Sequence, residues 1–512
     1  MQEGCIPQDW KSSVVLPIYK GKGDPMECGS YRGIKLLEHA MKVAEKIFEH
    51  RIRQQINIDD VQFGFMKGNG TTDAIFMSRQ MQENFRAKDR NLHFSFVDLE
   101  TAFDRVAREV ISSAMRKLGV EEWLVSAVMS MYTDAKTVVR TFYGNSKGFK
   151  VKVGMHQGSA VSPFLFVIVM EAISREFRVA LPWELLYADD LVVIAETEEE
   201  LIKRLNEWKD NAESKGMRVN INKTKVMISG ERQIVRQKAV KWPCGVCCKG
   251  VGRNSLLCTS CQKWVHKKCS GIKGSMSKVV KSFTCRGCLN PVTGAGRTSV
   301  DIGASANLEV VEKFCYLGDM LSVEGDADAA VEARIRIGWN KFRQLVPLLT
   351  NKDVSLFMRG RLYSSCVRSS MLHGSETWPV RKENVVALQR AEMRMVRWMC
   401  GTKLKDRLPS KELREKLGTD DIALVLQQNR LRWYGHVLRK EDDDWVKKCM
   451  EYEVEGPRPR GRPKRTWREV VKEDCLARKL KKVDRSKWRK LIKNVGCEWV
   501  SVSSGTGLPG LS

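Results

Sequence analysis

The stretch "LLYADDLVVIAE" at 185–196 places two carboxylates, Asp189 and Asp190, side by side between two apolar runs. The runs predict two short buried strands, and the chain would reverse between them near Ala188. Asp is a common turn former, so the simplest alternative is an ordinary hairpin turn. Two like charges this close repel each other unless a cation lies between them, which favours a metal site.

A third carboxylate completes this hypothesis. In "FSFVDLETAFDRV" at 94–106, Asp98 ends an apolar strand, and Phe103 and Asp104 follow in a turn or helix. A strand that ends in Asp can lie beside a hairpin tipped with Asp-Asp in one sheet. Three carboxylates gathered in this way can hold two Mg²⁺ ions for in-line attack on phosphorus. Asp98, Asp189 and Asp190 are therefore the predicted catalytic and magnesium-binding residues.

The stretch "MHQGSAVSPFLF" at 155–166 lies between these two segments. Gly158 and Ser159 would let the backbone approach a ligand closely, and Pro163 would open an apolar helix. An ordinary helix entry is the alternative.

Taken together, these motifs resemble the reverse transcriptases of non-LTR (LINE-type) retrotransposons. "FVDLETAFD", "HQGSAVSPFLF" and "YADD" look like the family's palm motifs A, B and C, in the right order and at the right spacing. The resemblance implies an α+β fold with a right-hand polymerase palm and fingers and an α-helical thumb. The implied partners are an RNA template, a DNA primer or target, and deoxynucleoside triphosphates. Other similar segments are "WKSSVVLPIYKGKGD", "YRGIKLL", "GMRVNINKTKVMIS" and "FCYLGDML" at 314–321.

The resemblance also implies roles for single residues. Phe103 would be the steric gate under the incoming sugar, and Gln157 and Gly158 would border the nascent base pair. Lys20 and Arg32 would meet the triphosphate, and Lys223 or Lys225 would donate a proton to pyrophosphate. The remaining matches form the primer grip: Phe314, Tyr316, Leu317 and Gly318.

The family pattern is not intact. The chain is expected to begin in the middle of the fingers, as an N-terminally truncated member that lacks the apurinic-type endonuclease usually encoded upstream. Met66 in "GFMKG" stands where family members often carry a basic residue, which affects the expected template contacts.

Half of the sixteen cysteines fall between 244 and 288. Their spacing, with one histidine, follows the four-Cys, His, three-Cys order of a PHD-type zinc finger. Eight ligands in four evenly paired steps favour two Zn²⁺ ions over a buried thiol cluster. In the cross-braced arrangement the first and third pairs share one ion. Cys248 is spare, though it could replace Cys247. The predicted zinc ligands are Cys244, Cys247, Cys258, Cys261, His266, Cys269, Cys285 and Cys288.

The charge of this block bears on its ligand. Residues 241–290 carry ten Lys or Arg and no Asp or Glu. Trp264 matches an aromatic residue that PHD fingers use to read methylated lysine, but a histone tail is itself basic. Repulsion therefore disfavours a histone tail and favours nucleic-acid phosphates. The insertion lies between motif D and the primer grip, so we expect it near the exit of template and primer.

Composition supports a nucleic-acid partner for the whole chain. The formal charge of +27 and a pI near 9.5 indicate a polyanionic partner. The longest apolar run, at 163–170, is too short to span a bilayer, and the start of the chain has no apolar signal core. We therefore expect nuclear and cytoplasmic localisation without a membrane partner.

The predicted organisation has four parts. They are reverse transcriptase fingers and palm over 1–235, the zinc finger over 241–290, primer grip and helical thumb over 305–450, and a basic tail over 451–512 with an AT-hook-like segment at 458–467. A solvated basic linker is the alternative for that last segment. Helical periodicity predicts helices over 127–136 and 384–399, and a Gly/Ser-rich linker over 291–307 is expected after the zinc finger. The rival function is a catalytically inactive remnant that binds nucleic acid or chromatin through its zinc finger. Group II intron-type and telomerase-type enzymes share the chemistry but lack the "YLG" resemblance.

Overall fold

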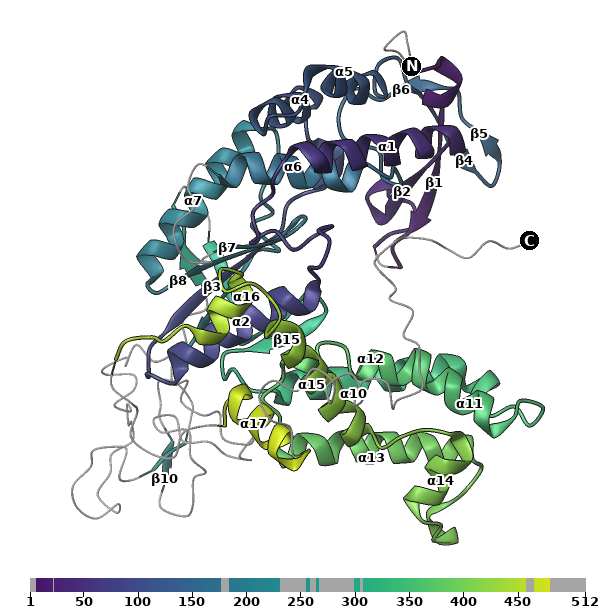
Figure 1. Ribbon diagram of the computed structural model, residues 1–512, viewed down its shortest axis with the longest axis vertical. Coiled ribbons are helices and arrows are strands. Elements are labelled where there is room, and N and C mark those ends of the chain that lie inside the picture. The colour runs from purple at the N-terminus through teal and green to yellow at the C-terminus, as the bar shows by residue number, and fades with distance from the viewer. Residues whose placement is uncertain are drawn as a thin grey trace.

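The computed structural model describes residues 6–21, 23–175, 184–230, 255–257, 264–266, 299–303, 307–456 and 465–478. These parts form an open arc with a small sheet at one end, a six-stranded sheet in the middle and a group of helices at the other end (Figure 1). Within the described ranges, no helix is both long enough and apolar enough to cross a membrane.

The six-stranded sheet has the order β12-β13-β9-β3-β8-β7. It is called the catalytic sheet below because the three predicted catalytic carboxylates lie at its strand ends. Its bounds are β3 Leu92–Val97, β7 Glu184–Tyr187, β8 Asp190–Ala195, β9 Lys225–Ser229, β12 Ser299–Asp301 and β13 Asn307–Val310. The predicted hairpin at 185–196 is confirmed as β7 and β8, with Tyr187 paired to Asp190.

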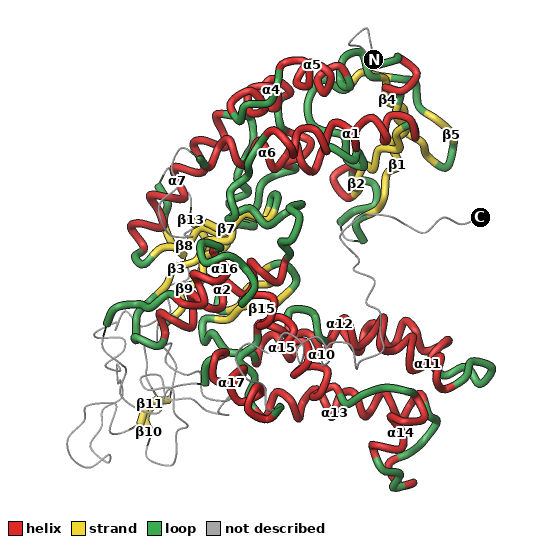
Figure 2. The backbone as a smooth tube through the Cα atoms, in the orientation of Figure 1, coloured by secondary structure: helices red, strands yellow, loops and turns green. Residues whose placement is uncertain are grey.

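Side chains alternate across the catalytic sheet. Phe94 and Phe96 face one hydrophobic core, which α2 (Thr71–Arg86) covers, and Val97 faces the other core. The helices on that second face include α6 (Ser162–Ser174) and α7 (Glu198–Ser214). Figure 2 shows the strands of the sheet lying between α7 on one side and α2 on the other. The two-residue period of a strand therefore buries both faces of the sheet.

The N-terminal sheet consists of β1 (Ser13–Tyr19), β2 (Tyr31–Leu37), β4 (Lys136–Thr141) and the short β5 (Gly144–Asn145) and β6 (Phe149–Lys150). Strand β1 is antiparallel to β2 and parallel to β4. The helices of this region are α1 His39–Gln55, α3 Ala102–Arg105, α4 Arg108–Lys117 and α5 Glu122–Ser130. The helix predicted over 127–136 is wrong beyond Ser130, because the chain turns at Asp134, with φ 57°, into β4.

The segment predicted as a Gly/Ser-rich linker contains β12 and ends where β13 begins. Strand β13 pairs parallel to β9, and β12 pairs antiparallel to β13, so the chain re-enters the catalytic sheet after the cysteine block. Within that block the structure describes β10 (Ser255–Leu257) and β11 (Trp264–His266), which pair antiparallel.

A hairpin and a helical region follow. The hairpin is β14 (Lys313–Tyr316) and β15 (Asp319–Ser322), and the helix predicted over 384–399 is confirmed within α13. The helices are α10 Asp328–Leu349, α11 Leu356–Leu362, α12 Ser369–Met371, α13 Lys382–Met399, α14 Ser410–Leu417, α15 Ile422–Val437, α16 Trp445–Glu451 and α17 Trp467–Ala477.

Helix α17 lies in the stretch assigned from sequence to a basic tail. Its apolar residues Trp467, Val470 and Val471 are buried, at the spacing of one helix face. The Trp467 ring packs edge-on against Phe76 of α2, with centroids 4.7 Å apart, and the Trp467 backbone N–H donates to Glu83 at 2.9 Å. This part of the tail is therefore packed against the catalytic half of the molecule.

Candidate active site

The three predicted carboxylates lie at one edge of the catalytic sheet. Val97 pairs with Leu191, so Asp98 and Asp190 occupy the next position of the same antiparallel register. The Asp98 backbone N–H donates to Thr224 Oγ1 at 3.2 Å, and the Asp98 carbonyl accepts from the Asn220 N–H at 2.8 Å. The end of β3 is thus held by the loop that precedes β9.

The tight turn at Ala188 and Asp189 is held from outside the hairpin. Ala188 has a φ of 57°, and Gln62 Oε1 accepts from the N–H groups of Ala188 at 3.3 Å and Gly64 at 3.0 Å. A Cβ at Gly64 would lie 2.4 Å from the Ala188 nitrogen, so only glycine fits against the turn. Gln62 and Gly64 were not among the predicted site residues, because their support of this turn depends on the fold and not on the local sequence.

The electrostatics of this edge are those of crowded like charges. Burial raises the pKa of Asp190 to about 6, with further contributions from Asp189 and Asp98. Burial also raises the pKa of Asp189, Asp98 raises it further, and Arg32 opposes the rise. A cation bound here would relieve this repulsion, and carboxylate oxygens suit Mg²⁺.

The carboxylates are not assembled as a ready-made metal site. Among the described residues, no three His, Cys, Asp or Glu side chains converge closely enough to hold an ion. Asp98 Oδ2 instead contacts Lys223 Nζ at 3.3 Å. Repulsion among the acids and attraction to this lysine both act against convergence. The donor chemistry therefore fits Mg²⁺, and the predicted arrangement of the ligands is not preformed.

Phe103 lies on α3, five residues after Asp98, which itself follows the last residue of β3. Its ring stacks on Phe166 of α6, with centroids 4.6 Å apart and planes at 20°. Its carbonyl accepts from the Met155 N–H at 2.7 Å. The ring is therefore packed against α6, and the Phe103 backbone is bound to the loop that precedes α6.

The predicted loop residues Gln157 and Gly158 connect β2 of the N-terminal sheet with α3. Gln157 Nε2 donates to Asp104 Oδ2 at 3.0 Å, and the Gln157 carbonyl accepts from the Lys35 N–H of β2 at 2.7 Å. Gly158 has a φ of 106°, and a Cβ there would lie 2.4 Å from the Lys35 carbonyl oxygen. The glycine is thus required by both backbone conformation and space. The helix predicted from Pro163 is confirmed as α6.

Cations of the N-terminal sheet act on the same edge. Arg32 lowers the pKa of Asp189, and Lys20 and Arg32 both lower that of Asp104, against the rise that burial causes. Lys20 Nζ donates to the Gly29 carbonyl at 2.8 Å. Lys35, which the sequence analysis missed, has a pKa lowered to about 8 by burial and by Arg108. The available signal was a second cation three residues after Arg32 in "YRGIKLL".

The structure separates the two candidate proton donors. Lys225 Nζ is bound to Glu309 Oε2 at 2.8 Å, whereas Lys223 Nζ contacts Asp98. Of the two, Lys223 is the one at the carboxylates.

The predicted primer-grip residues form the β14–β15 hairpin beside the catalytic sheet. Phe314 stacks on Phe96 of β3, with centroids 4.1 Å apart, and Tyr316 is buried. The pKa of Tyr316 is raised by burial and then by the charge of Asp190. Leu317 and Gly318 form the turn, both with positive φ.

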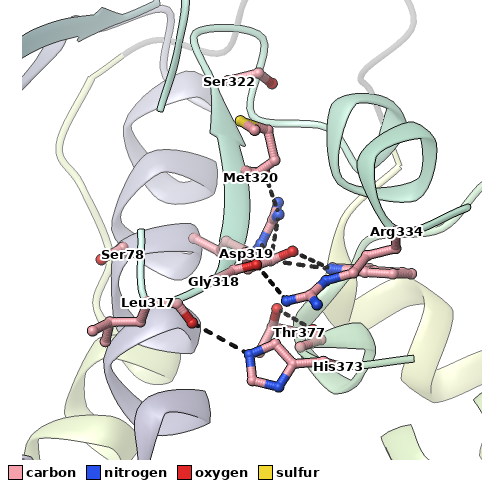
Figure 3. Close-up of polar contacts among 12 residues, drawn as sticks. Ser78, Leu317, Gly318, Asp319, Met320, Ser322, Arg334, His373 and Thr377 are labelled. Atoms are coloured by element: carbon pink, nitrogen blue, oxygen red, sulfur yellow. Dashed lines mark hydrogen bonds and ion pairs between the residues drawn. The ribbon is translucent and has the colours of Figure 1, made fainter. Parts of the chain in front are cut away.

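A buried polar network, unforeseen from sequence, fixes this turn (Figure 3). Asp319 Oδ2 accepts from Arg79 Nη2 at 2.8 Å and from Trp378 Nε1 at 3.1 Å. Arg334 of α10 donates to the Gly318 carbonyl, and His373 Nε2 lies 3.3 Å from the Leu317 carbonyl oxygen. Helix α2 and the helical region therefore hold the turn together.

The predicted zinc site lies almost wholly outside the described residues. All seven cysteine ligands fall there, and of His266 only the backbone in β11 is described. Trp264 is described and 40% exposed. The core of the AT-hook-like segment, 458–464, also lies outside the described residues.

Carboxylates at the end of a central strand and at a hairpin tip, faced by cations and a fixed aromatic ring, are suited to nucleotidyl transfer. Residues 18–270 match the protein family described as Reverse transcriptase (RNA-dependent DNA polymerase). This stretch contains all three carboxylates.

Two curated relatives come from retrotransposable elements. The chain is 23% identical over 410 residues to the "Probable RNA-directed DNA polymerase from transposon BS" of Drosophila melanogaster, covering 77% of this chain and 38% of that protein. It is 26% identical over 227 residues to the "Retrovirus-related Pol polyprotein from type-1 retrotransposable element R2" of Nasonia vitripennis, covering 42% and 22%. The chain thus spans less than half the length of either relative. Among solved structures, apo telomerase from Candida tropicalis is similar to this chain, with a TM-score of 0.39 and 12% sequence identity. The match covers 86% of this chain and 69% of the telomerase chain.

Proposed function

We propose that this chain is an RNA-directed DNA polymerase of the non-LTR retrotransposon type, which extends a DNA primer along an RNA template. The observation that carries the proposal is the set of three carboxylates at one sheet edge, inside the stretch that matches the reverse transcriptase family. The pKa values of Asp189 and Asp190 are raised at this edge. A bound divalent cation would remove the repulsion between these carboxylates, which supports a metal site.

Asp98, Asp189 and Asp190 would hold two Mg²⁺ ions, which supply a lowered pKa for the primer 3′-hydroxyl and charge neutralisation on the triphosphate. Lys20 and Arg32 would bind the triphosphate oxygens, because both cations act electrostatically on this edge. Lys223 would supply a proton to the leaving pyrophosphate. Its contact with Asp98 keeps it within reach of the reacting atoms.

Phe103 would exclude ribonucleotides by bulk. The stack on Phe166 supports this role, because a ring that cannot rotate away enforces a steric limit. Gln157 and Gly158 would border the nascent base pair. The turn at Leu317 and Gly318 would position the primer end, since the buried network leaves it little freedom.

The cysteine block would be a PHD-like finger with two Zn²⁺ ions that binds nucleic acid, in a protein of the nucleus and cytoplasm. Its support is the pattern of eight ligands and the basic composition. The β10–β11 pairing also supports the finger. It pairs Leu257 with Trp264, and the predicted ligands Cys258 and Cys261 lie between these two residues in the sequence. Atomic absorption of the purified chain should give two zinc ions, and one or none would contradict the finger.

The deciding experiment is primer extension by the purified chain on an RNA template with Mg²⁺. DNA synthesis that needs template, primer and deoxynucleotides supports the proposal. A chain that binds primer–template but never extends it would instead favour the non-catalytic rival.

A further inference from the structure

The most exposed aromatic side chains of the described residues lie far from the catalytic edge. Phe142 and Tyr143 are 98% and 97% exposed, and they are adjacent residues at the tip between β4 and β5. Their rings meet edge-to-face, with centroids 5.7 Å apart. Two neighbouring rings held out in solvent gain nothing for the fold, because they bury almost no area.

The strands below this tip are strongly cationic. Residues 136–153, called the aromatic hairpin here, contain five Lys or Arg and no Asp or Glu. All five cations are exposed: Lys136, Arg140, Lys147, Lys150 and Lys152. Lys150 is bound to Asp134 at 2.5 Å, which leaves four without that neutralisation. Exposed rings among cations form the combination that binds single-stranded nucleic acid, by stacking on bases and pairing with phosphates.

The register of the N-terminal sheet fixes the direction of the tip. Strand β4 runs parallel to β1, with Ser13 opposite Thr137 and Val15 opposite Val139. The tip beyond β4 therefore points toward the same end of the sheet as Lys20, which follows the last residue of β1. On β2, Arg32 pairs with Ile18 near that end. The aromatic hairpin forms the outer edge of this sheet (Figure 1).

We propose that the aromatic hairpin is a binding site for single-stranded nucleic acid, whose occupant is the unpaired template strand ahead of the active site. Only the naming of that strand as template rests on the proposed function. A duplex is a poor occupant, because its bases are already stacked and cannot cover Phe142 and Tyr143.

The test measures binding of the full chain, without nucleotides, to two primer–templates. One has a long single-stranded RNA overhang, and the other is trimmed blunt. The double variant Phe142→Ala/Tyr143→Ala should bind the overhang form at least about 25-fold more weakly, since each of the two lost base stacks costs at least about fivefold. Binding of the blunt form should stay unchanged. The variant Phe142→Trp/Tyr143→Trp should retain binding, and Leu404→Ala, at another exposed apolar residue, serves as the control.

A second pair of variants separates stacking from charge. Lys147→Gln/Lys152→Gln should flatten the salt dependence of overhang binding by about 1.4 units of slope, at roughly 0.7 per phosphate contact on a single strand. The aromatic variant should leave that slope unchanged. Equal weakening on both substrates, or none on either, would overturn the proposal. Because binding needs no catalysis, a chain that extends no primer yet keeps the overhang difference removes the proposed polymerase activity alone.

Discussion

The carboxylates at two places in this molecule differ in whether the protein itself neutralises their negative charge. At the catalytic edge, Asp189 and Asp190 lie close together and their pKa values are raised. At the β14–β15 turn, Asp319 is fully buried and bound by Arg79 and Trp378. The charge of Asp319 is therefore balanced by hydrogen bonds and an ion pair within the protein. Asp189 and Asp190 instead repel each other and Asp98.

The difference indicates what each group is for. A buried carboxylate with its own arginine and indole fixes geometry and needs no ligand. Crowded carboxylates at a solvent-accessible edge lower the stability of the metal-free protein and increase its affinity for a cation. Removing a charge should therefore have opposite effects on stability at the two places.

The largest expected effect is on catalysis at the exposed group. Asp189→Ala should reduce primer extension at least about a thousandfold, since several kcal/mol of transition-state stabilisation by a metal ion would be lost. Without Mg²⁺ the melting temperature should stay the same or rise slightly, because repulsion is relieved. The isosteric Asp189→Asn should behave alike. Extension that survives either change would refute the carboxylate assignment.

The buried group should show the opposite result in stability. Asp319→Ala leaves Arg79 uncompensated beneath the turn, and both side chains are almost fully buried, at 3% and 0% exposed. The unfolding free energy should fall by about 3–5 kcal/mol in urea denaturation.

A double variant, Arg79→Met/Asp319→Leu, controls for the loss of charge alone. It replaces the pair by apolar side chains and should recover most of the stability. If the double variant is as unstable as Asp319→Ala, packing and not the unpaired charge explains the loss.

Sequence reasoning found the exposed group and missed the buried one for a physical reason. The hairpin tipped by Asp189 follows from two apolar runs that lie within a dozen positions of each other. Arg79 and Asp319 are 240 positions apart, and nothing local marks either as a partner. Gln62 likewise reaches Ala188 only because the fold brings together two residues that are 126 positions apart.

The strands and helix found in predicted linker and tail have the same explanation. Strand β12 has three residues and β13 four, too few for a periodic signal, and pairing with β9 stabilises them. Helix α17 is ordered by burying Trp467 against α2. Tertiary packing decided these segments against a composition that indicated loops.

A third carboxylate, Glu83, is buried with no arginine of the described residues bound to it, and it should make the stability of the protein depend on pH. Glu83 is buried on α2, one turn after Arg79, and burial raises its pKa from 4.5 to about 7. The folded state therefore holds a proton that the unfolded state releases. This contribution to stability is complete below about pH 4.5 and is lost as the pH rises through about 7.

Glu83→Gln should remove this pH dependence. The amide oxygen can still accept from the Trp467 N–H, so the contact to α17 is retained. At pH 8 the variant should be more stable than the parent by roughly 1–3 kcal/mol, and at pH 4.5 the two should be equal. Urea denaturation at both pH values measures the difference. A variant destabilised at pH 8 would show that the ionised carboxylate is needed for packing.

The smallest effect concerns the exposed ion pair of Lys223 and Asp98 at the catalytic edge. Like Arg79–Asp319, Lys223–Asp98 is an ion pair between a cation and a carboxylate, but its side chains are 66% and 40% exposed. Lys223→Gln should therefore change the unfolding free energy by less than about 1 kcal/mol. Because the pair is weak, Asp98 can leave Lys223 for a metal ion at little cost. Removing the competing ammonium should raise the Mg²⁺ affinity of the nucleic-acid-free chain by up to about fivefold in calorimetric titration, since 1 kcal/mol corresponds to that ratio. A lower affinity would mean that Lys223 helps to position Asp98 for the ion, and the exposed pair would then resemble the buried one.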